Sequence, residues 1–217
     1  MGEKRHARCQ RLCNLSKKPR APSIELGHVG KPKVTRIQVA VFQLETAIEL
    51  WFSEKDLASI ITLAFAAHEI IYKLNKALPK AQVSVADPDQ APAGYSEEWH
   101  KIFRLDSYFC KHGGSDPLEA HYLSVDALPY VLLDALLMYK ALGFHRRLYF
   151  YLLEMWFLTI HPEIFKIPAK DNGLSQFYIE QCRAMGRNEY FKLGREHLAA
   201  DGAAPWSPVV HPQGLKP

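Results

Sequence analysis

His68 is the first residue whose type and position could do chemistry. It interrupts the otherwise apolar stretch LASIITLAFAAHEII. The imidazole of histidine titrates near neutral pH, so it can serve as a metal ligand or as an acid–base group. A histidine on an apolar helix face can equally be a buried side chain that is hydrogen-bonded to a neighbouring helix. Both interpretations stay open from the sequence.

A second polar group lies in the stretch KHGGSDP, which contains Lys111, His112 and Asp116. Two glycines beside a histidine and a lysine, next to a helix start, could bind an anion. The alternative is an exposed turn with solvated charges, in which Asp116 caps the next helix. We take His68, Lys111, His112 and Asp116 as the candidate site residues. A shared site requires that folding bring His68 within hydrogen-bonding reach of this turn.

We predict no metal or cofactor site. Glu119 and His121 are too close in sequence to share a helix face, as the Glu-x-x-His pair of a di-iron bundle does. His6, Cys9 and Cys13 have the chemistry of ligands but lack a recognised zinc spacing. The chain also lacks a P-loop, a dinucleotide fingerprint, a G-x-S-x-G motif and an H-E-x-x-H motif. These patterns favour a protein that is not an enzyme.

The residues around His68 predict two amphipathic helices. The first, over residues 36–52, has an apolar face at helical spacing made of Ile37, Ala40, Val41, Leu44, Ile48, Trp51 and Phe52. The second, over about residues 54–78, has Ser53 as its expected N-cap and carries His68 on its apolar stripe. Their short connection makes them an antiparallel hairpin.

Further helices are expected over about residues 97–111, 117–143, 146–160, 175–185 and 188–199. Within them, Pro129 is expected to bend a helix and Gly143 to end it as the C′ residue. Residues 81–86 are the only short strand candidate. The predicted fold class is therefore all-α, a single irregular bundle of six to seven helices within residues 34–200.

Charge separates the N-terminal arm from this helical domain. Residues 1–36 hold ten Lys or Arg and two Glu, a balance of +8, in a chain whose net charge is +4, so residues 37–217 have a balance of −4. We expect residues 1–33 to be a disordered basic arm and residues 201–217 a disordered tail. The acidic body has no nucleic-acid footprint, so contact with nucleic acid is expected only through residues 1–33.

Two apolar segments, Leu128–Leu142 and Leu148–Ile160, are shorter than the ~20 residues that a membrane span needs, and Asp134 and Glu154 interrupt them. The basic N-terminus is not followed by the apolar core of a secretory signal. We expect a cytoplasmic protein with no membrane partner.

Three stretches of the chain carry a resemblance to a known group. QLETAIELWF (43–52) and DLASIITLAFAAHEII (56–71) are similar to the opening hairpin of a group of uncharacterised, mainly bacterial helical proteins, and SYFCKHGGSDP (107–117) is similar to their Phe-Lys-His turn ending in Asp-Pro. The resemblance covers about residues 34–145. Because it begins near Val34, we expect residues 1–33 to be an upstream extension from a wrongly assigned start codon.

More distantly, the arrangement is similar to HEPN-type helical domains, some of which are ribonucleases. Their catalytic signature is an arginine followed a few residues later by a histidine, and here Arg104 and His112, the closest approach to it, are too far apart. The resemblance therefore implies at most a non-catalytic, ligand-sensing or nucleotide-sensing role.

Three hypotheses for function follow. The first is a cytoplasmic, non-enzymatic helical protein that acts through self-association or a protein partner. The second is a HEPN-like sensor or enzyme with a polar pocket formed by His68, Lys111, His112 and Asp116. The third is nucleic-acid contact through residues 1–33.

Overall fold

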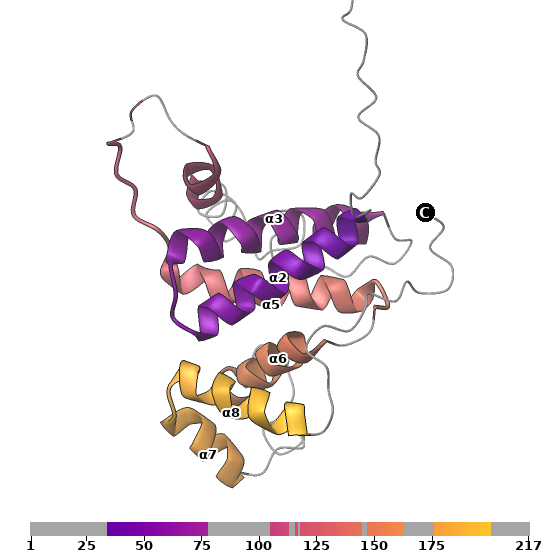
Figure 1. The fold of residues 1–217 in the computed structure, drawn as a ribbon, viewed down its shortest axis with the longest axis vertical. Helices are drawn as coiled ribbons and strands as arrows, with labels where there is room; N and C mark the ends of the chain where they lie inside the picture. The colour runs from indigo at the N-terminus through magenta and orange to yellow at the C-terminus, as the bar shows by residue number, and fades with distance from the viewer. Residues whose placement is uncertain are drawn as a thin grey trace, which may run out of the picture. The chain divides into compact units, whose positions relative to one another are not determined.

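The computed structural model describes residues 34–77, 105–112, 116, 118–144, 147–162 and 176–200, with the side chains of 198–200 excepted. Within these ranges 78% of the residues are helical and none lies in a strand. The predicted all-α bundle is therefore confirmed (Figure 1). The basic arm, the strand candidate at 81–86 and the C-terminal tail lie outside the described residues.

The N-terminal hairpin consists of α2 (Arg36–Phe52) and α3 (Leu57–Lys76). Thr35 begins α2 with a capping box: its hydroxyl accepts from the backbone N–H of Gln38, whose side chain accepts from the backbone N–H of Thr35. Every residue of the predicted apolar face of α2 is buried. The same face also buries Glu45, a charged side chain that the periodicity did not predict.

The turn between the two helices differs from the prediction. Ser53 is the C-cap of α2, and Asp56 is the N-cap of α3, accepting from the backbone N–H of Ser59 at 2.8 Å. The chain reverses through a Schellman motif, in which the N–H of Lys55 donates to the carbonyl of Leu50 at 3.0 Å. Glu54 adopts the left-handed conformation, with φ of 54°, that such a motif requires at C′. Because Ser53 and the residues after it form this motif at the end of α2, they cannot also form the first turn of a helix capped by Ser53. Helix α3 therefore begins three residues later than expected.

Pro129 starts a helix instead of bending one. Residues 118–124 are not helical, a single 3₁₀ turn follows at Val125–Ala127, and α5 runs over Leu128–Ala141. Proline is tolerated in the first turn because the N–H groups there have no intrahelical partner. The predicted long helix from Pro117 is therefore wrong in its first half.

Gly143 ends α5 at C′ as predicted, with φ of 78°. A side chain with a Cβ is strained at this φ, so we expect Gly143→Ala to lower the free energy of unfolding by about 1–2 kcal/mol. Gly143→Asn should cost less, because asparagine tolerates the left-handed region. Urea denaturation of the two variants tests this, and equal costs for Ala and Asn would contradict it.

The C-terminal helices are α6 (Leu148–Ile160), α7 (Gln176–Ala184) and α8 (Arg187–Ala200), each close to its predicted range. In Figure 1, α2, α3 and α5 lie together and α6, α7 and α8 form a second group beside them. The two groups meet in an aromatic cluster of Trp51, Phe52, Tyr149, Trp156, Tyr190 and Phe191.

Helix α3 also bears on the question of a membrane. Among the described residues it is long and apolar enough to cross a bilayer, judged by length and composition alone. Core helices that pack inside a protein meet the same criteria, so this is weak evidence. The absence of a membrane partner stays a prediction.

Candidate functional site

His68 is hydrogen-bonded to Asp134, a buried carboxylate of α5. The distance from Nε2 of His68 to Oδ2 of Asp134 is 2.8 Å, and the side chains are 15% and 3% exposed. A buried carboxylate requires a partner, and α3 supplies it from the neighbouring helix. Such a carboxylate also fixes the orientation and tautomer of an imidazole. The pair can do acid–base chemistry only if a substrate reaches the small exposed part of the ring.

Mixed charges surround the outer side of His68. The ammonium of Lys73 donates to Glu69 at 2.6 Å and lowers the pKa of that carboxyl; partial burial opposes this effect, and the charge of Lys111 lowers the pKa further. Burial lowers the pKa of Lys111, while the nearby carboxylate of Glu69 opposes this effect. The ring of Tyr72 lies nearly parallel to that of His68, with centroids 6.3 Å apart. Of the predicted turn residues, Lys111 is thus linked to the surroundings of His68, through Glu69.

His112 and Asp116 have other partners. The ring of His112 lies against Tyr108, with centroids 4.7 Å apart. Asp116 is exposed and accepts from the backbone N–H of Leu118 at 2.9 Å, which is a local turn contact. The glycines of the turn lie outside the described residues. The four predicted site residues therefore do not share one set of contacts, and the structure joins His68 to Asp134.

A second buried carboxylate, Asp106, organises the segment that follows. Its Oδ1 lies 2.7 Å from Nε2 of His121, and its Oδ2 accepts from the backbone N–H of Ser124 at 2.8 Å. Asp106 is buried and His121 is part-buried. This contact fixes the non-helical residues 118–124 against the helical residues 105–111.

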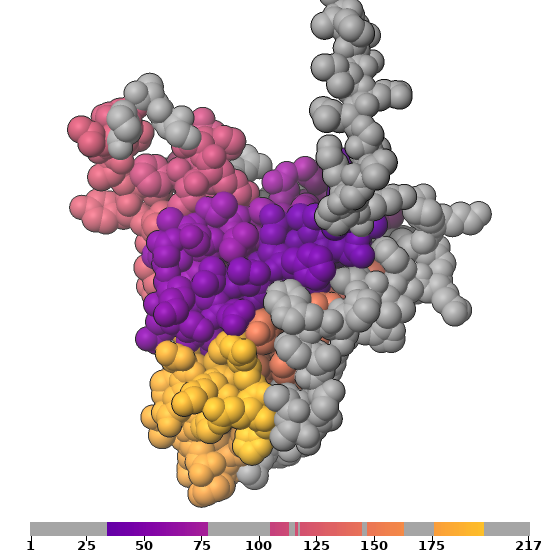
Figure 2. All heavy atoms as spheres, in the orientation of Figure 1, coloured from indigo at the N-terminus to yellow at the C-terminus, as the bar shows by residue number. Residues whose placement is uncertain are grey.

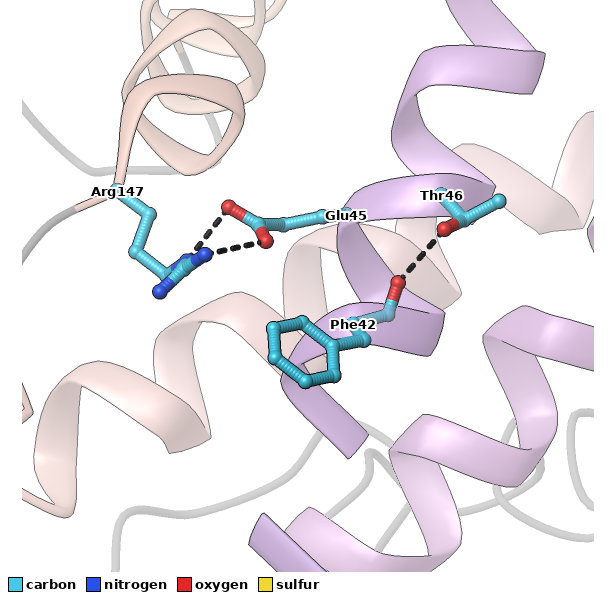
Figure 3. A network of polar contacts seen from close by, with 4 residues as sticks. All are labelled: Phe42, Glu45, Thr46 and Arg147. Atoms are coloured by element: carbon cyan, nitrogen blue, oxygen red, sulfur yellow. Dashed lines mark hydrogen bonds and ion pairs between the residues drawn. The ribbon is translucent and has the colours of Figure 1, made fainter. Parts of the chain in front are cut away.

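Within the described ranges, the most deeply buried charge pair joins Glu45 of α2 to Arg147, the N-cap of α6 (Figure 3). Nε and Nη2 of Arg147 donate to the two carboxylate oxygens of Glu45 at 2.6 and 2.7 Å. Burial raises the pKa of Glu45, and the guanidinium partly offsets this effect. Burial also raises the pKa of the nearby Tyr139 to about 12. The planar fork of arginine suits a carboxylate in this bidentate geometry, so the contact sets how α6 meets α2.

None of these pairs was predicted from the sequence. The sequence analysis treats Asp134 only as an interruption of an apolar segment and assigns no partner to Glu45. The available signal was a carboxylate at a position whose helical neighbours are apolar or aromatic, such as Asp134 between Val131 and Leu137. That signal indicates a buried acid but does not identify its partner.

The part of the chain that the structure describes contains no group of three or more His, Cys, Asp or Glu side chains that could hold a metal ion.

No family model matches the chain, and neither a curated protein nor a solved structure matches it. The function proposed below therefore rests on the molecule's own surfaces and contacts.

Proposed function

We propose that this protein is a cytoplasmic, non-enzymatic helical protein that acts by binding another protein chain, in the first place a second copy of itself. The observation that carries the proposal is a set of exposed large apolar side chains on residues 105–112 and 118–125, here called the 105–125 surface. Its exposed large apolar side chains are Leu105, Tyr108, Phe109, Leu118, Tyr122 and Val125.

These side chains are exposed to an unusual extent for their size. Leu118 is 88% exposed and Tyr122 is 98% exposed. Single exposed apolar residues are common, but several in one short segment are typical of an interaction site. Tyrosine is also among the residue types that contribute most to binding energy. Figure 2 shows the segment, in magenta and pink, at one edge of the molecule.

Contacts within the segment hold it in place, which favours a surface that is ordered before binding over a flexible segment. Asp106 accepts from His121 and from the backbone of Ser124, and the ring of Phe109 lies 5.1 Å from that of His121. A surface that is fixed before binding loses less conformational entropy on association. Pairing His68 with Asp134 inside the bundle also supports a structural use of that histidine.

The test is the oligomeric state of the double variant Tyr108→Ser/Tyr122→Ser. We expect the wild-type chain to self-associate in sedimentation equilibrium and the variant to do so at least about tenfold more weakly, since two aromatic contacts are lost.

The matched control is Phe42→Ser/Leu74→Ser, which removes two exposed apolar side chains from α2 and α3. Its association constant should equal that of the wild type. A wild-type chain that stays monomeric throughout, or a control that weakens association as much as the test variant, would count against the 105–125 surface.

A further inference from the structure

The hairpin of α7 and α8, here called the strap (residues 176–200), is anchored by few buried side chains. Among its described side chains these are Ile179, Cys182, Tyr190 and Phe191. By contrast, α2 buries nine of its 17 residues. Elements with little buried apolar area open at a lower free energy than the rest of a protein. The strap is therefore suited to detach as a unit while the other helices stay folded.

The surface beneath the strap, here called the acceptor surface, consists of aromatic rings from α2 and α6. Phe191 stacks on Phe52 at 4.8 Å with an interplanar angle of 4°, and Tyr190 meets Trp156 edge-on at 5.0 Å. The hydroxyl of Tyr190 donates to the backbone carbonyl of Leu152 at 3.2 Å. If the strap detached, it would expose a ready-made aromatic surface.

Close packing defines the shape that fits. At Gly194 a Cβ atom would lie 2.4 Å from Cδ2 of Leu152. Helix α8 therefore crosses α6 at a point where only a glycine fits without movement of Leu152. A helix that replaces α8 must carry the same small residue, which any second copy of this chain does.

Opposite charges line the edges of this contact. Arg195 of α8 lies 3.1 Å from Glu49 of α2, and Arg187 at the start of α8 lies 3.7 Å from Glu54. The guanidinium of Arg187 also covers the ring of Trp51 at 4.5 Å. The strap thus carries aromatic rings flanked by arginines, and the acceptor surface carries aromatic rings flanked by glutamates. These two sets of side chains face each other.

These edge contacts hold the strap only weakly. The side chains of both ion pairs are partly exposed, so salt screens them. Within the described residues, Nε of Arg187 is buried without a hydrogen-bond partner. The edge contacts are therefore weak and the aromatic centre fixes the shape of the contact, so a second copy can offer the same set of contacts in exchange.

We propose that the strap detaches and that the acceptor surface binds the strap of a second copy of this chain. The acceptor surface belongs to α2 and α6 and is separate from the 105–125 surface. Self-association through the strap would persist in Tyr108→Ser/Tyr122→Ser, whereas self-association through the 105–125 surface would not, so the two proposals fail on different results.

Two charge-swapped full-length chains test the exchange. One carries Arg187→Glu and Arg195→Glu, so its strap and acceptor surface are both negative. The other carries Glu49→Arg and Glu54→Arg, so both are positive. Each chain repels its own strap, but in a mixture each strap meets the opposite charge on the other chain. Native mass spectrometry should show at least about tenfold more dimer in the mixture than in either chain alone.

In the control, the second chain carries Glu69→Arg in place of its two substitutions, so that its charge change lies on α3 away from the strap. Mixing this chain with the first should produce no additional dimer. Circular dichroism must first show that both chains keep wild-type helicity. If the mixture then contains no more dimer than either chain alone, the proposal is overturned.

Hydrogen exchange of the wild-type chain decides the matter if a variant fails to fold. Amides of 176–197 should exchange together, at least about tenfold faster than those of α2, and faster still at high salt. If these amides are protected as strongly as those of α2, at both low and high salt, the proposal is also overturned.

Discussion

Replacing Glu45 with leucine should lower the free energy of unfolding by about 3–5 kcal/mol. The substitution leaves the guanidinium of Arg147 buried without the carboxylate that receives two of its N–H groups. The guanidinium stays buried but loses the carboxylate that offset its desolvation, so the cost exceeds that of the lost contact alone. Guanidinium chloride denaturation measures the change.

The double variant Glu45→Leu/Arg147→Met separates the cost of removing one member of the pair from the value of the pair itself. Replacing both partners with apolar side chains of similar volume is commonly neutral or stabilising, by as much as about 1–4 kcal/mol. We therefore expect the double variant to recover most of the stability that Glu45→Leu loses. The double-mutant cycle then gives the coupling between the two side chains.

Glu69→Gln is the matched control. It also removes one partner of an ion pair, but Glu69 and Lys73 are both largely exposed. Exposed pairs of this spacing contribute about 0.3–0.5 kcal/mol. If Glu45→Leu cost no more than Glu69→Gln, the buried pair would not be the contact that fixes α6 against α2.

Helical periodicity was enough to predict α2 and its buried face. The seven apolar residues chosen from the 3.6-residue repeat are all buried, because one face of a surface helix must pack on the core. The same reasoning placed α6, α7 and α8 to within two residues at each end. Local patterns succeed where burial follows from sequence spacing alone.

Helix boundaries next to competing caps were harder to predict. Ser53 and Asp56 are both good N-caps, and the sequence does not say which one the chain uses. The structure uses Asp56 because the end of α2 takes Ser53, Glu54 and Lys55 into its own hydrogen-bonded turn. At Pro129 the error was similar, since proline can bend a helix or begin one.

The candidate site could be predicted only in part. The sequence singles out His68 as a polar residue on an apolar stripe, and the expected partner was the turn at residues 111–116. Its hydrogen-bond partner Asp134 lies 66 residues along the chain, and Arg147 lies 102 residues from Glu45. Such pairings depend on how helices cross, and a single sequence carries no direct record of that geometry.

Replacing Phe52 with alanine should lower the free energy of unfolding by about 3–5 kcal/mol. The side chain is fully buried, and its ring contacts Trp156 of α6 and Phe191 of α8. Alanine would leave a cavity where α2, α6 and α8 meet, and the rings around it can close the gap only in part. Chemical denaturation followed by tryptophan fluorescence measures the loss.

Phe42→Ala provides the comparison on the same helix. Phe42 is 40% exposed, so its truncation should cost less than about 1 kcal/mol.

The part of the protein that each substitution destabilises is equally informative, because Phe52 contacts the strap and Phe42 lies on the other side of Glu45 along α2. The Phe52→Ala substitution should therefore increase the rate of amide hydrogen exchange more in residues 176–197 than in α3. An even rise across all helices would mean that α8 and the N-terminal hairpin unfold as one unit, and the strap could then not detach on its own.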